Sequence, residues 1–311
     1  MTNILQKDNY ICNIIRKHIK LDCNDKFEAL ENTNKLISII TINNCNLNCH
    51  FCRGGLQKDD LAEYSRYKIM STEEFKNIVD KCLDGDKQFF DLTPAIGEPF
   101  LDKNFIEKLQ ILEDDDRALE YTFTTNLLLL KEADVIKLAS LKKLILDISL
   151  YGNSKDEYLK NTDKDKYDDF LKQLEMLYEF CGNTKIRFIQ RCNLEQDTLL
   201  SQYVSTFRKN KMANLTLSEQ YNLNRAGQVS DNPARQRSGV CPYGPGGGGG
   251  IVSGGNVLFC PFHDFKRDGV VGNIFNKSLN EIYHDAPWKK IINSHTNNEY
   301  TGMCKNCDES W

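Results

Sequence analysis

The chain lacks both a long apolar segment and an excess of basic charge. No stretch of its 311 residues approaches the ~20 consecutive apolar residues with which a helix crosses a bilayer. Residues 1–8 are too polar for the apolar part of a secretory signal peptide. With 40 Lys and Arg against 44 Asp and Glu, the formal net charge is −4, so no basic surface for nucleic acid is expected. The composition predicts a soluble cytoplasmic protein without membrane or nucleic-acid partners.

Cysteine, in contrast, is abundant, with 12 residues. Without an export signal disulfides are not expected, so we interpret the cysteines first as metal ligands. Cys45, Cys49 and Cys52 lie in the run Cys-Asn-Leu-Asn-Cys-His-Phe-Cys. Three thiolates can bind three irons of a cubane cluster and leave the fourth iron open for a substrate. Structural zinc is the alternative, but zinc takes four ligands, and His50 lies between two of the cysteines.

Short apolar or β-branched runs alternate with helix-like stretches from about residue 36. We predict strands over residues 36–42, 88–93, 120–125, 143–150, 185–191 and 214–219. We predict helices over residues 71–83, from 102, and over 131–139, 165–180 and 196–209, the first opened by a capping box of Ser71 and Glu74. Six strand–helix repeats indicate an α/β fold with a parallel, barrel-like sheet.

In barrels of this kind the chemistry lies at the carboxyl ends of the strands. Polar residues follow each predicted strand there, and an ordinary turn is the alternative for each of them. They are Gly97 and Glu98 after the second strand, Asn126 after the third, Ser149 at the end of the fourth, Gln190 and Cys192 at the fifth, and Tyr221 and Arg225 after the sixth.

The pattern Cys-x3-Cys-x-aromatic-Cys directly after an apolar strand resembles the signature of the radical S-adenosylmethionine (SAM) superfamily. The resemblance implies that Cys45, Cys49 and Cys52 ligate a [4Fe–4S] cluster whose open iron chelates the amino and carboxylate groups of SAM. One electron, supplied by a flavodoxin- or ferredoxin-type donor, then cleaves SAM to methionine and a 5′-deoxyadenosyl radical. That radical abstracts a hydrogen atom from the substrate.

The same resemblance implies roles for the residues at the strand ends. Phe51 lies where the family has an aromatic residue near the adenine. Gly97-Glu98-Pro99 resembles the Gly-Gly-Glu-Pro element that holds the SAM amino group, with Ile96 in place of the first glycine. Asn126 and Ser149 correspond to contacts with the ribose and the SAM carboxylate. Gln190 is a further candidate contact. The implied fold is a partial (β/α)6 barrel, open on one side.

The character of the sequence changes after about residue 235. Residues 231–239 read as a linker, and residues 242–250 are dense in glycine. That run lacks the Lys-Ser/Thr of a phosphate-binding loop, and we expect a flexible loop. Four cysteines surround it, and their spacing alone does not separate structural zinc from an iron–sulfur cluster. They are Cys241, Cys260, Cys304 and Cys307.

Cys-x18-Cys with Gly-x4-Cys, followed by Cys-x2-Cys, resembles the twitch domain, a shortened SPASM domain. The resemblance implies that these four cysteines hold one auxiliary [4Fe–4S] cluster. We therefore predict an amino-terminal extension over residues 1–35, a radical SAM partial barrel over 36–230 and a small α+β twitch domain over 231–311.

A fully ligated second cluster is useful where an electron must leave a substrate radical. We therefore expect an oxidoreductase that dehydrogenates a polar small molecule in natural-product or cofactor biosynthesis. Arg225 is the candidate for orienting the substrate or taking its proton, although a surface role for this arginine is an equal alternative. Tyr221 is a second candidate for the catalytic site.

Two other functions fit the sequence. One is modification of a ribosomally made peptide, by epimerisation or a thioether crosslink, with Cys192 as a hydrogen-atom donor. The other, from a different class, is a non-catalytic iron–sulfur electron carrier or sensor. Neither the identity of the substrate nor the role of residues 1–35 is evident from the sequence, since substrate-binding loops follow no fixed pattern.

Overall fold

The structure is a computed structural model that describes residues 35–52, 68–217, 226, 239–241, 244, 248–262 and 268–307. The strands within these ranges are β1 (Leu36–Ile40), β2 (Phe89–Asp91), β3 (Glu120–Thr125), β4 (Leu144–Leu150), β5 (Lys185–Gln190), β6 (Ala213–Leu217), β7 (Gly250–Val252), β8 (Asn256–Leu258) and β9 (Val270–Asn273). The helices are α4 (Thr72–Asp84), α5 (Phe105–Asp114), α6 (Glu132–Ser140), α7 (Lys155–Thr162), α8 (Tyr167–Phe180), α9 (Leu199–Asn210), α10 (Leu279–His284) and α11 (Ala286–Thr296), with short 3₁₀ helices η5 (Pro99–Leu101) and η7 (Gly302–Asn306).

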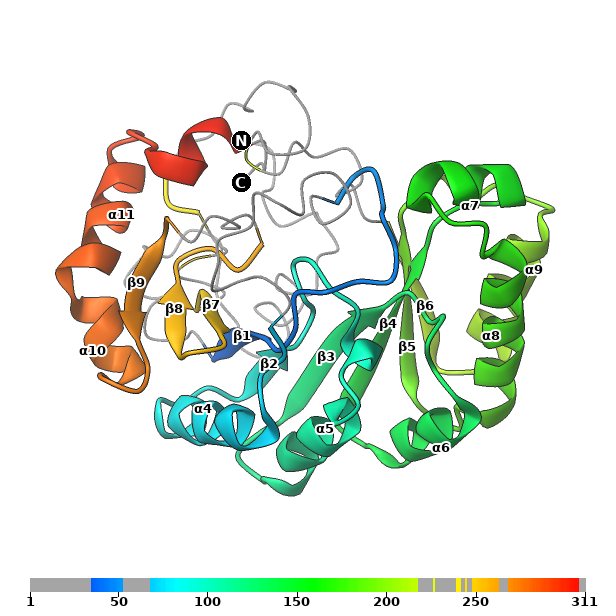
Figure 1. Cartoon of the computed structure of the whole chain (residues 1–311), viewed down its shortest axis with the longest axis horizontal. Helices are drawn as coiled ribbons and strands as arrows, with labels where there is room; N and C mark the ends of the chain where they lie inside the picture. Colours follow the sequence, from blue (N-terminus) through cyan, green and yellow to red (C-terminus); the bar gives the residue numbers. More distant parts are fainter. Residues whose placement is uncertain are drawn as a thin grey trace.

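Strands β1 to β6 form a parallel sheet in chain order, and each of the six predicted strands is confirmed. Four of the predicted helices correspond to α4, α6, α8 and α9, and the one expected from residue 102 begins at Phe105. Helix α7 was not predicted. In Figure 1 the helices α4, α5, α6, α8 and α9 form an outer arc around these strands.

The carboxyl-terminal strands continue the same sheet. β7 pairs in parallel with β1, with Ser38 opposite Gly250, and β8 and β9 follow in antiparallel pairing. Within the described residues the order is β6-β5-β4-β3-β2-β1-β7-β8-β9, with β6 and β9 at the edges. The sheet is therefore open, as a partial barrel requires.

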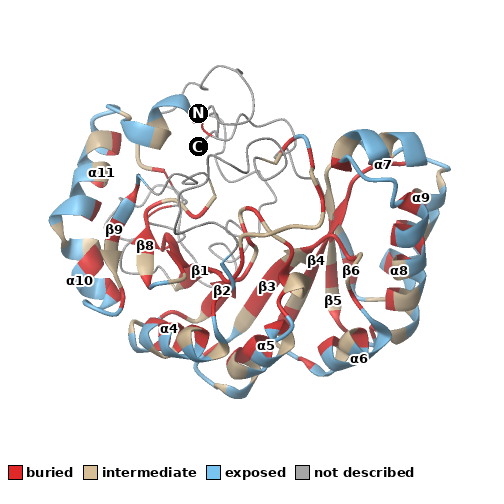
Figure 2. Cartoon of the chain, viewed as in Figure 1, coloured by how far each residue is buried: buried red, intermediate tan, exposed pale blue. Residues whose placement is uncertain are grey.

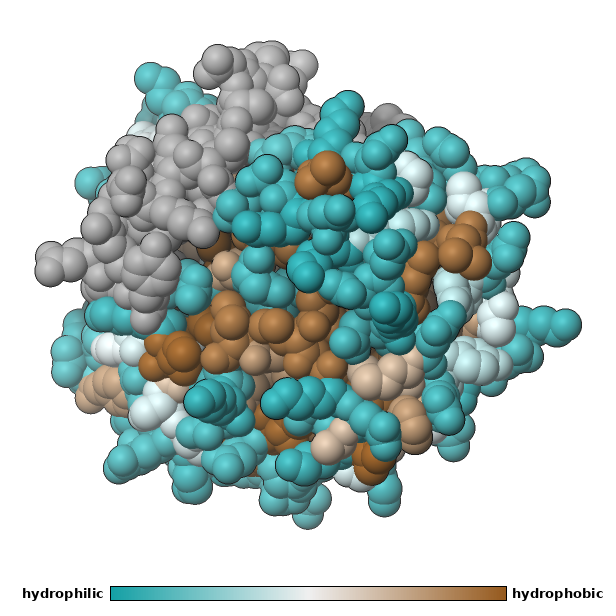
Figure 3. All heavy atoms as spheres, turned by 45° about the vertical axis from the view of Figure 1, so that its right-hand side comes forward, coloured by the Kyte–Doolittle hydropathy of each residue, from teal (hydrophilic) through white to brown (hydrophobic). Residues whose placement is uncertain are grey.

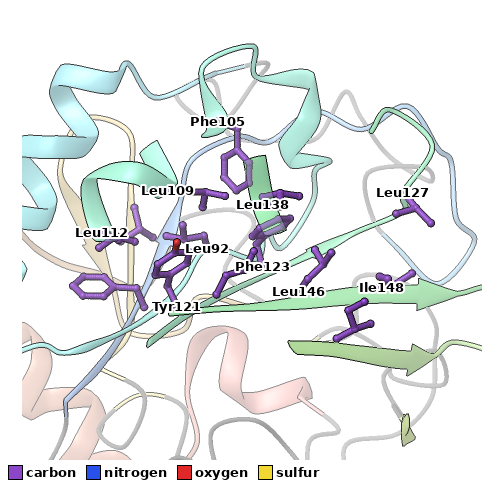
Figure 4. Close-up of a cluster of buried hydrophobic side chains, with 14 of the residues drawn as sticks. Leu92, Phe105, Leu109, Leu112, Tyr121, Phe123, Leu127, Leu138, Leu146 and Ile148 are labelled. Atoms are coloured by element: carbon purple, nitrogen blue, oxygen red, sulfur yellow. The ribbon is translucent and has the colours of Figure 1, made fainter. Parts of the chain in front are cut away.

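The hydrophobic core lies between the sheet and the outer helices. Because side chains alternate along a strand, one face of β2 to β4 presents apolar residues to the helices. Figure 4 shows Phe123 and Leu146 of the sheet beside Phe105, Leu109 and Leu138 of α5 and α6. Figure 2 shows the buried residues concentrated along the strands and on the inward sides of these helices.

The Ser71 half of the predicted capping box is confirmed, whereas the Glu74 carboxylate bonds to the β7–β8 turn instead. The Ser71 hydroxyl accepts a hydrogen bond from Glu74 N over 3.1 Å. The Glu74 carboxylate accepts from Ser253 Oγ at 3.1 Å and from Gly254 N at 2.5 Å. This glutamate therefore ties the start of α4 to the β7–β8 turn.

A buried lysine forms a second connection between two halves of the structure, the half from β1 to β6 and the half from β7 to η7. The Lys87 amino group lies 4.8 Å from the centroid of the Tyr283 ring in α10, and the Tyr283 hydroxyl donates to Gly248 O over 2.9 Å. Burial lowers the pKa of Lys87 to about 7, while the neighbouring Cys82 and Asp86 act to raise it. The two halves are thus joined by packing as well as by strand pairing.

The end of the glycine run is not the flexible loop that the sequence predicted. Gly248 and Gly249 are buried, with φ of +69° and +74°, and Gly250 begins β7. A Cβ atom on Gly248 would lie 2.3 Å from Leu36 O, and one on Gly249 would lie 2.2 Å from Leu258 O. Glycine is required because the neighbouring backbones approach so closely. Residues 245–247 lie outside the described residues.

No helix in the described part of the chain is both long and apolar enough to span a bilayer. Figure 3 shows one face of the molecule on which hydrophilic side chains surround a band of hydrophobic ones.

The glycines at the start of β7 provide a stability test. We expect Gly249→Ala to lower the free energy of unfolding by more than ~3 kcal/mol, since it adds a backbone clash to the strain of a positive φ. Gly254→Ala is the matched control, because Gly254 also has a positive φ (+89°) but open space around a Cβ. It should cost only about 1–2 kcal/mol. Equal losses in denaturant titrations of the two cofactor-free variants would contradict this account of the sheet.

Candidate active site

The cysteine loop follows β1 and is held by the carboxyl end of α7. Thr162 O accepts a hydrogen bond from Asn48 N at 3.0 Å, and Asn161 O accepts from His50 N at 3.2 Å. Cys49 lies between these two contacts and is buried. The last carbonyls of a helix have no partners within the helix, so they are available to bind a neighbouring segment.

The three thiols of the loop lie within electrostatic range of one another. Burial, together with the charges of Glu98 and Cys52, raises the pKa of Cys45 to about 12, against the opposing effect of Leu47 N, 3.4 Å from Sγ. Burial and then the charges of Cys52 and Cys45 raise the pKa of Cys49. Buried thiols in this state become thiolates on metal binding, which displaces their protons.

Three soft thiol donors on one loop fit an iron–sulfur cluster, in which each iron takes its own thiolate. The described residues contain no group of three Cys, His, Asp or Glu side chains positioned to hold a single metal ion.

Glu98 lies buried beside this loop at the start of η5. Its carboxylate accepts from Thr125 Oγ1 at 2.7 Å, Asn126 N at 2.8 Å and Phe100 N at 3.3 Å, and Glu98 N donates to Asn44 O at 2.8 Å. Burial raises the pKa of Glu98 to about 7, against the opposing effect of these bonds. Both carboxylate oxygens are used within the chain, so Glu98 braces the ends of β2 and β3 under the loop.

Asn126 connects this brace to the cysteine loop. Its Nδ2 donates to Asn46 Oδ1 at 2.7 Å and lies 3.9 Å from Cys45 Sγ, while its Oδ1 accepts from Leu128 N at 3.1 Å. Asn126 is buried, and the following Leu127 has a φ of +71°. The predicted site residues Glu98 and Asn126 are therefore brought together next to Cys45.

Phe51 packs against a residue that the sequence analysis did not select. Its ring stacks on Tyr151, with centroids 6.2 Å apart and planes 13° apart. Burial and the charges of Cys49 and Cys45 raise the pKa of Tyr151, while Arg191 and a hydrogen bond with the Ser149 side chain oppose the rise. Phe51, Ser149 and Tyr151 thus form one group beside the cysteines.

Arg191, rather than the predicted Gln190, interacts with the cysteines at the end of β5. The charge of Arg191 lowers the pKa of both Cys49 and Tyr151. Alternation along the strand places Gln190 on the same side as Phe188, whose ring packs on Phe207 of α9. Gln190 therefore belongs to the helix-facing side of the strand.

Cys192 is buried, and its thiol donates to Leu150 O at the carboxyl end of β4 over 3.6 Å. Burial, followed by the charges of Glu157 and Glu195, raises its pKa to about 12. Its role as a hydrogen-atom donor stays a prediction. The two remaining catalytic candidates, Tyr221 and Arg225, lie outside the described residues.

The sheet face opposite the helices, here called the inner face, carries polar side chains. Arg187 Nε and Nη2 donate to the two carboxylate oxygens of Asp147 over 2.7 and 2.5 Å. The hydroxyls of Thr93 and Thr124 lie 3.2 Å apart. Burial raises the pKa of Asp91 to about 6, with a further rise from the charge of Asp147. The inner face therefore offers both donors and acceptors to a ligand.

His295 is a buried histidine that contacts three segments near the carboxyl-terminal cysteines. Its imidazole accepts from Cys241 N through Nδ1 at 3.3 Å. The centroid of its ring lies 5.4 Å from that of Phe259, which precedes Cys260, and 5.0 Å from that of Tyr300, which precedes η7. The sequence analysis did not select His295.

Cys304 lies in η7 and Cys307 directly after it. Cys304 N donates to Thr301 O at 3.1 Å, and Cys307 is buried. The Tyr300 hydroxyl donates to Gly239 O over 2.9 Å, and Asn298 Oδ1 accepts from Gly239 N over 2.8 Å. These bonds join the chain before Cys241 to the chain before Cys304.

Two family models match the chain. The radical SAM superfamily model matches residues 39–189, and the SPASM model, an iron–sulfur cluster-binding domain, matches residues 241–308. Curated relatives include GTP 3′,8-cyclases of Campylobacter jejuni, 26% identical over 176 residues, which cover 56% of this chain and 52% of the relative. The chain thus spans about half the length of these relatives.

Several solved structures share the fold. BtrN in complex with AdoMet and 2-DOIA aligns with a TM-score of 0.56 at 18% identity, covering 88% of this chain and 93% of BtrN. Streptococcus suis SuiB bound to the precursor peptide SuiA aligns with a TM-score of 0.56 at 16% identity, covering 93% of this chain and 78% of SuiB. The structure of anSMEcpe with bound AdoMet aligns with a TM-score of 0.59 at 14% identity, covering 87% of this chain and 84% of anSMEcpe.

The open parallel sheet with a cysteine loop after β1, together with these matches, defines a radical SAM domain followed by a SPASM-like iron–sulfur domain. The chain belongs to the radical SAM superfamily. Its cofactors are SAM and a [4Fe–4S] cluster, with an auxiliary iron–sulfur cluster in the carboxyl-terminal domain.

The brace formed by Glu98 can be tested by a pair of substitutions. Glu98→Gln replaces one acceptor oxygen by an amide, leaving Asn126 N without its partner, so we expect a stability loss of about 1–3 kcal/mol. We also expect SAM affinity to fall at least tenfold because Asn126 is displaced. Glu113→Gln is the control, since Glu113 accepts from Lys142 N and Lys143 N away from the cysteine loop. Anaerobic equilibrium dialysis with labelled SAM should show weaker binding for Glu98→Gln only, and unchanged affinity would contradict the assignment.

Proposed function

We propose that this chain cleaves SAM reductively to a 5′-deoxyadenosyl radical, abstracts a hydrogen atom from a polar small molecule and oxidises it with the help of the auxiliary cluster. In this proposal Cys45, Cys49 and Cys52 hold the SAM-binding cluster. The auxiliary cluster is held by Cys241, Cys260, Cys304 and Cys307. When bound, the first cluster supplies the electron that cleaves SAM.

The chain's own residues have separate roles in this proposal. Phe51 and Tyr151 provide an aromatic wall for the adenine, and Asn126 and Ser149 provide polar contacts for the ribose and the SAM carboxylate. Arg191 adds a positive charge beside Cys49, which favours an anionic group of SAM at this position. Glu98 holds Asn126 through one carboxylate oxygen, which has a second lone pair to accept from the SAM amino group.

The single observation that carries the choice of substrate class is the polar inner face. Asp91, Thr124, Asp147 and Arg187 lie on the side of the sheet opposite the apolar core. Asp147 is buried and already paired with Arg187. An apolar ligand on this face would gain no hydrogen bond from these polar groups, whereas a small molecule with several hydroxyl or amino groups can bond to them. BtrN, whose complex contains 2-DOIA, shares this fold.

Peptide modification has less support from the site. SuiB and anSMEcpe are solved with peptides, but their likeness to this chain extends to the fold. The thiol of the proposed hydrogen-atom donor, Cys192, is buried and bonded to Leu150 O. A non-catalytic electron carrier would leave the group of Phe51, Asn126 and Ser149 at the cysteine loop without a use. A flavodoxin- or ferredoxin-type donor and a reducing cytoplasmic setting complete the proposal.

SAM cleavage is the direct test of the first step. The anaerobically reconstituted protein with a reductant should convert SAM to methionine and 5′-deoxyadenosine, and Cys49→Ala should reduce the rate at least a hundredfold. Cys181→Ala is the control, because Cys181 is a buried cysteine at the end of α8. The rate is measured by chromatography of 5′-deoxyadenosine. Equal rates in the two variants would exclude the loop as the cluster site.

The substrate class can be tested with a panel of polyhydroxylated and amino-substituted small molecules against short linear peptides. We expect a member of the first group to increase 5′-deoxyadenosine formation and to be recovered with two hydrogens fewer. Arg187→Met should abolish this stimulation and leave SAM cleavage without substrate nearly unchanged, because Arg187 lies on the inner face rather than at the cysteines. Stimulation by peptides alone would favour the peptide-modifying alternative.

A further inference from the structure

Tyr158 of α7 is a buried tyrosine whose hydroxyl group is unpaired within the described part of the chain. The side chain is fully buried, and its Oη has no hydrogen-bond partner among the described residues. Leaving a buried hydroxyl unsatisfied costs about 1–3 kcal/mol, and such groups are rare in folded proteins. A phenylalanine at this position would fill the same space without that cost, so the hydroxyl calls for an explanation.

The position of Tyr158 is fixed by the contact between α7 and the cysteine loop. The carbonyls of Asn161 and Thr162, which bind His50 N and Asn48 N, lie one helical turn after Tyr158. Thr162 Oγ1 donates to Tyr158 O over 2.8 Å and fixes this turn. The same end of α7 that holds the loop on both sides of Cys49 therefore also positions Tyr158.

The ring of Tyr158 lies among aromatic residues that reach the cysteine loop. It meets the Tyr151 ring edge-on, with centroids 5.8 Å apart, and Tyr151 in turn stacks on Phe51 of the loop. On another side its ring centroid lies 5.9 Å from that of Tyr167 and 5.7 Å from that of Phe170. This packing fixes the ring while providing no partner for its oxygen.

The hydroxyl also lies within electrostatic range of the cysteines. Burial raises the pKa of Tyr158, and the charges of Cys49 and Cys45 as thiolates raise it further. A phenol with the ordinary pKa of about 10 is already protonated at neutral pH, so the hydroxyl is available as a hydrogen-bond donor.

The neighbouring tyrosines differ from Tyr158 in this respect. The Tyr167 hydroxyl donates to Asn153 O over 2.9 Å, and the Tyr151 hydroxyl forms a hydrogen bond with Ser149. Of these three hydroxyls in the described structure, that of Tyr158 is the one left for a group the polypeptide does not supply.

We propose that the Tyr158 hydroxyl donates a hydrogen bond to a sulfur of the iron–sulfur cluster held by the Cys45–Cys52 loop and thereby raises the reduction potential of that cluster. Adding an electron makes the cluster more negative, and a donor at its sulfur stabilises the added charge. The residue thus helps a biological donor to reduce the cluster before SAM is cleaved. The inference rests on the proposed assignment of the cluster to this loop.

The test is an anaerobic redox titration followed by electron paramagnetic resonance (EPR) of the SAM-responsive cluster. Tyr158→Phe should load iron as well as the native protein and should make reduction about tenfold less favourable, a shift of about 59 mV to lower potential for a one-electron couple. Tyr167→Phe removes a hydroxyl from the same aromatic group, one already bonded to Asn153, and should leave the potential unchanged. The auxiliary cluster serves as an internal reference and should not shift in either variant.

Each result of the redox titration either supports or contradicts the role proposed for the Tyr158 hydroxyl. An unchanged or higher potential in Tyr158→Phe would overturn the proposal, as would a variant that fails to fold or folds without iron, since the hydroxyl would then have a structural partner. A failure of the underlying assignment differs: the SAM-responsive signal would persist in Cys49→Ala. In the cofactor-free state Tyr158→Phe should be at least as stable as the native protein, because it removes an unsatisfied group.

Discussion

The site depends on hydrogen bonds that hold the cysteine loop from two directions. Carbonyls at the end of α7 bind the backbone on both sides of Cys49, while Asn126, braced by Glu98, reaches Asn46 and Cys45. A short loop has little core of its own and would otherwise be free to change conformation. Contacts from elements 80 to 114 residues away in the sequence hold the loop in one conformation.

The two faces of the sheet separate stability from function. The outer face is apolar and packs on α4 to α9, whereas the inner face carries Asp91, Asp147 and Arg187. Because alternation along each strand assigns every residue to one face or the other, the fold can keep a closed hydrophobic core and a polar surface for a ligand in the same strands. Pairing of β7 with β1, made possible by glycines that admit close backbone contact, joins the cluster-binding domain to this sheet.

The sequence predicted the elements whose patterns are strong. β3 matches its predicted bounds, and the other five parallel strands lie within or next to theirs, because short runs of β-branched, aromatic and other apolar residues, continuous or alternating, are typical of strands. Helix α7 was missed because only Tyr158 and Thr162 of its eight residues are buried, which leaves no clear apolar periodicity. Yet this helix holds the cysteine loop.

The sequence analysis missed several residues of the site because their roles depend on strand faces and on contacts across the fold. Gln190 and Arg191 are adjacent at the end of β5, and only the face of the strand, which composition does not reveal, decides which of them approaches Cys49. The roles of Tyr151 and His295 depend on contacts across the fold, with Phe51 in one case and Cys241 in the other. The glycine run was read as flexible because close approach of Leu36 and Leu258 is visible only in three dimensions.

The central claim is that the loop after β1 carries a cluster with one iron open to SAM. The most direct measurement is the EPR spectrum of the anaerobic, reduced protein recorded with and without SAM. The account predicts that SAM changes the signal of one cluster and leaves that of the auxiliary cluster in place. A protein that holds only zinc, or a spectrum indifferent to SAM, would contradict it.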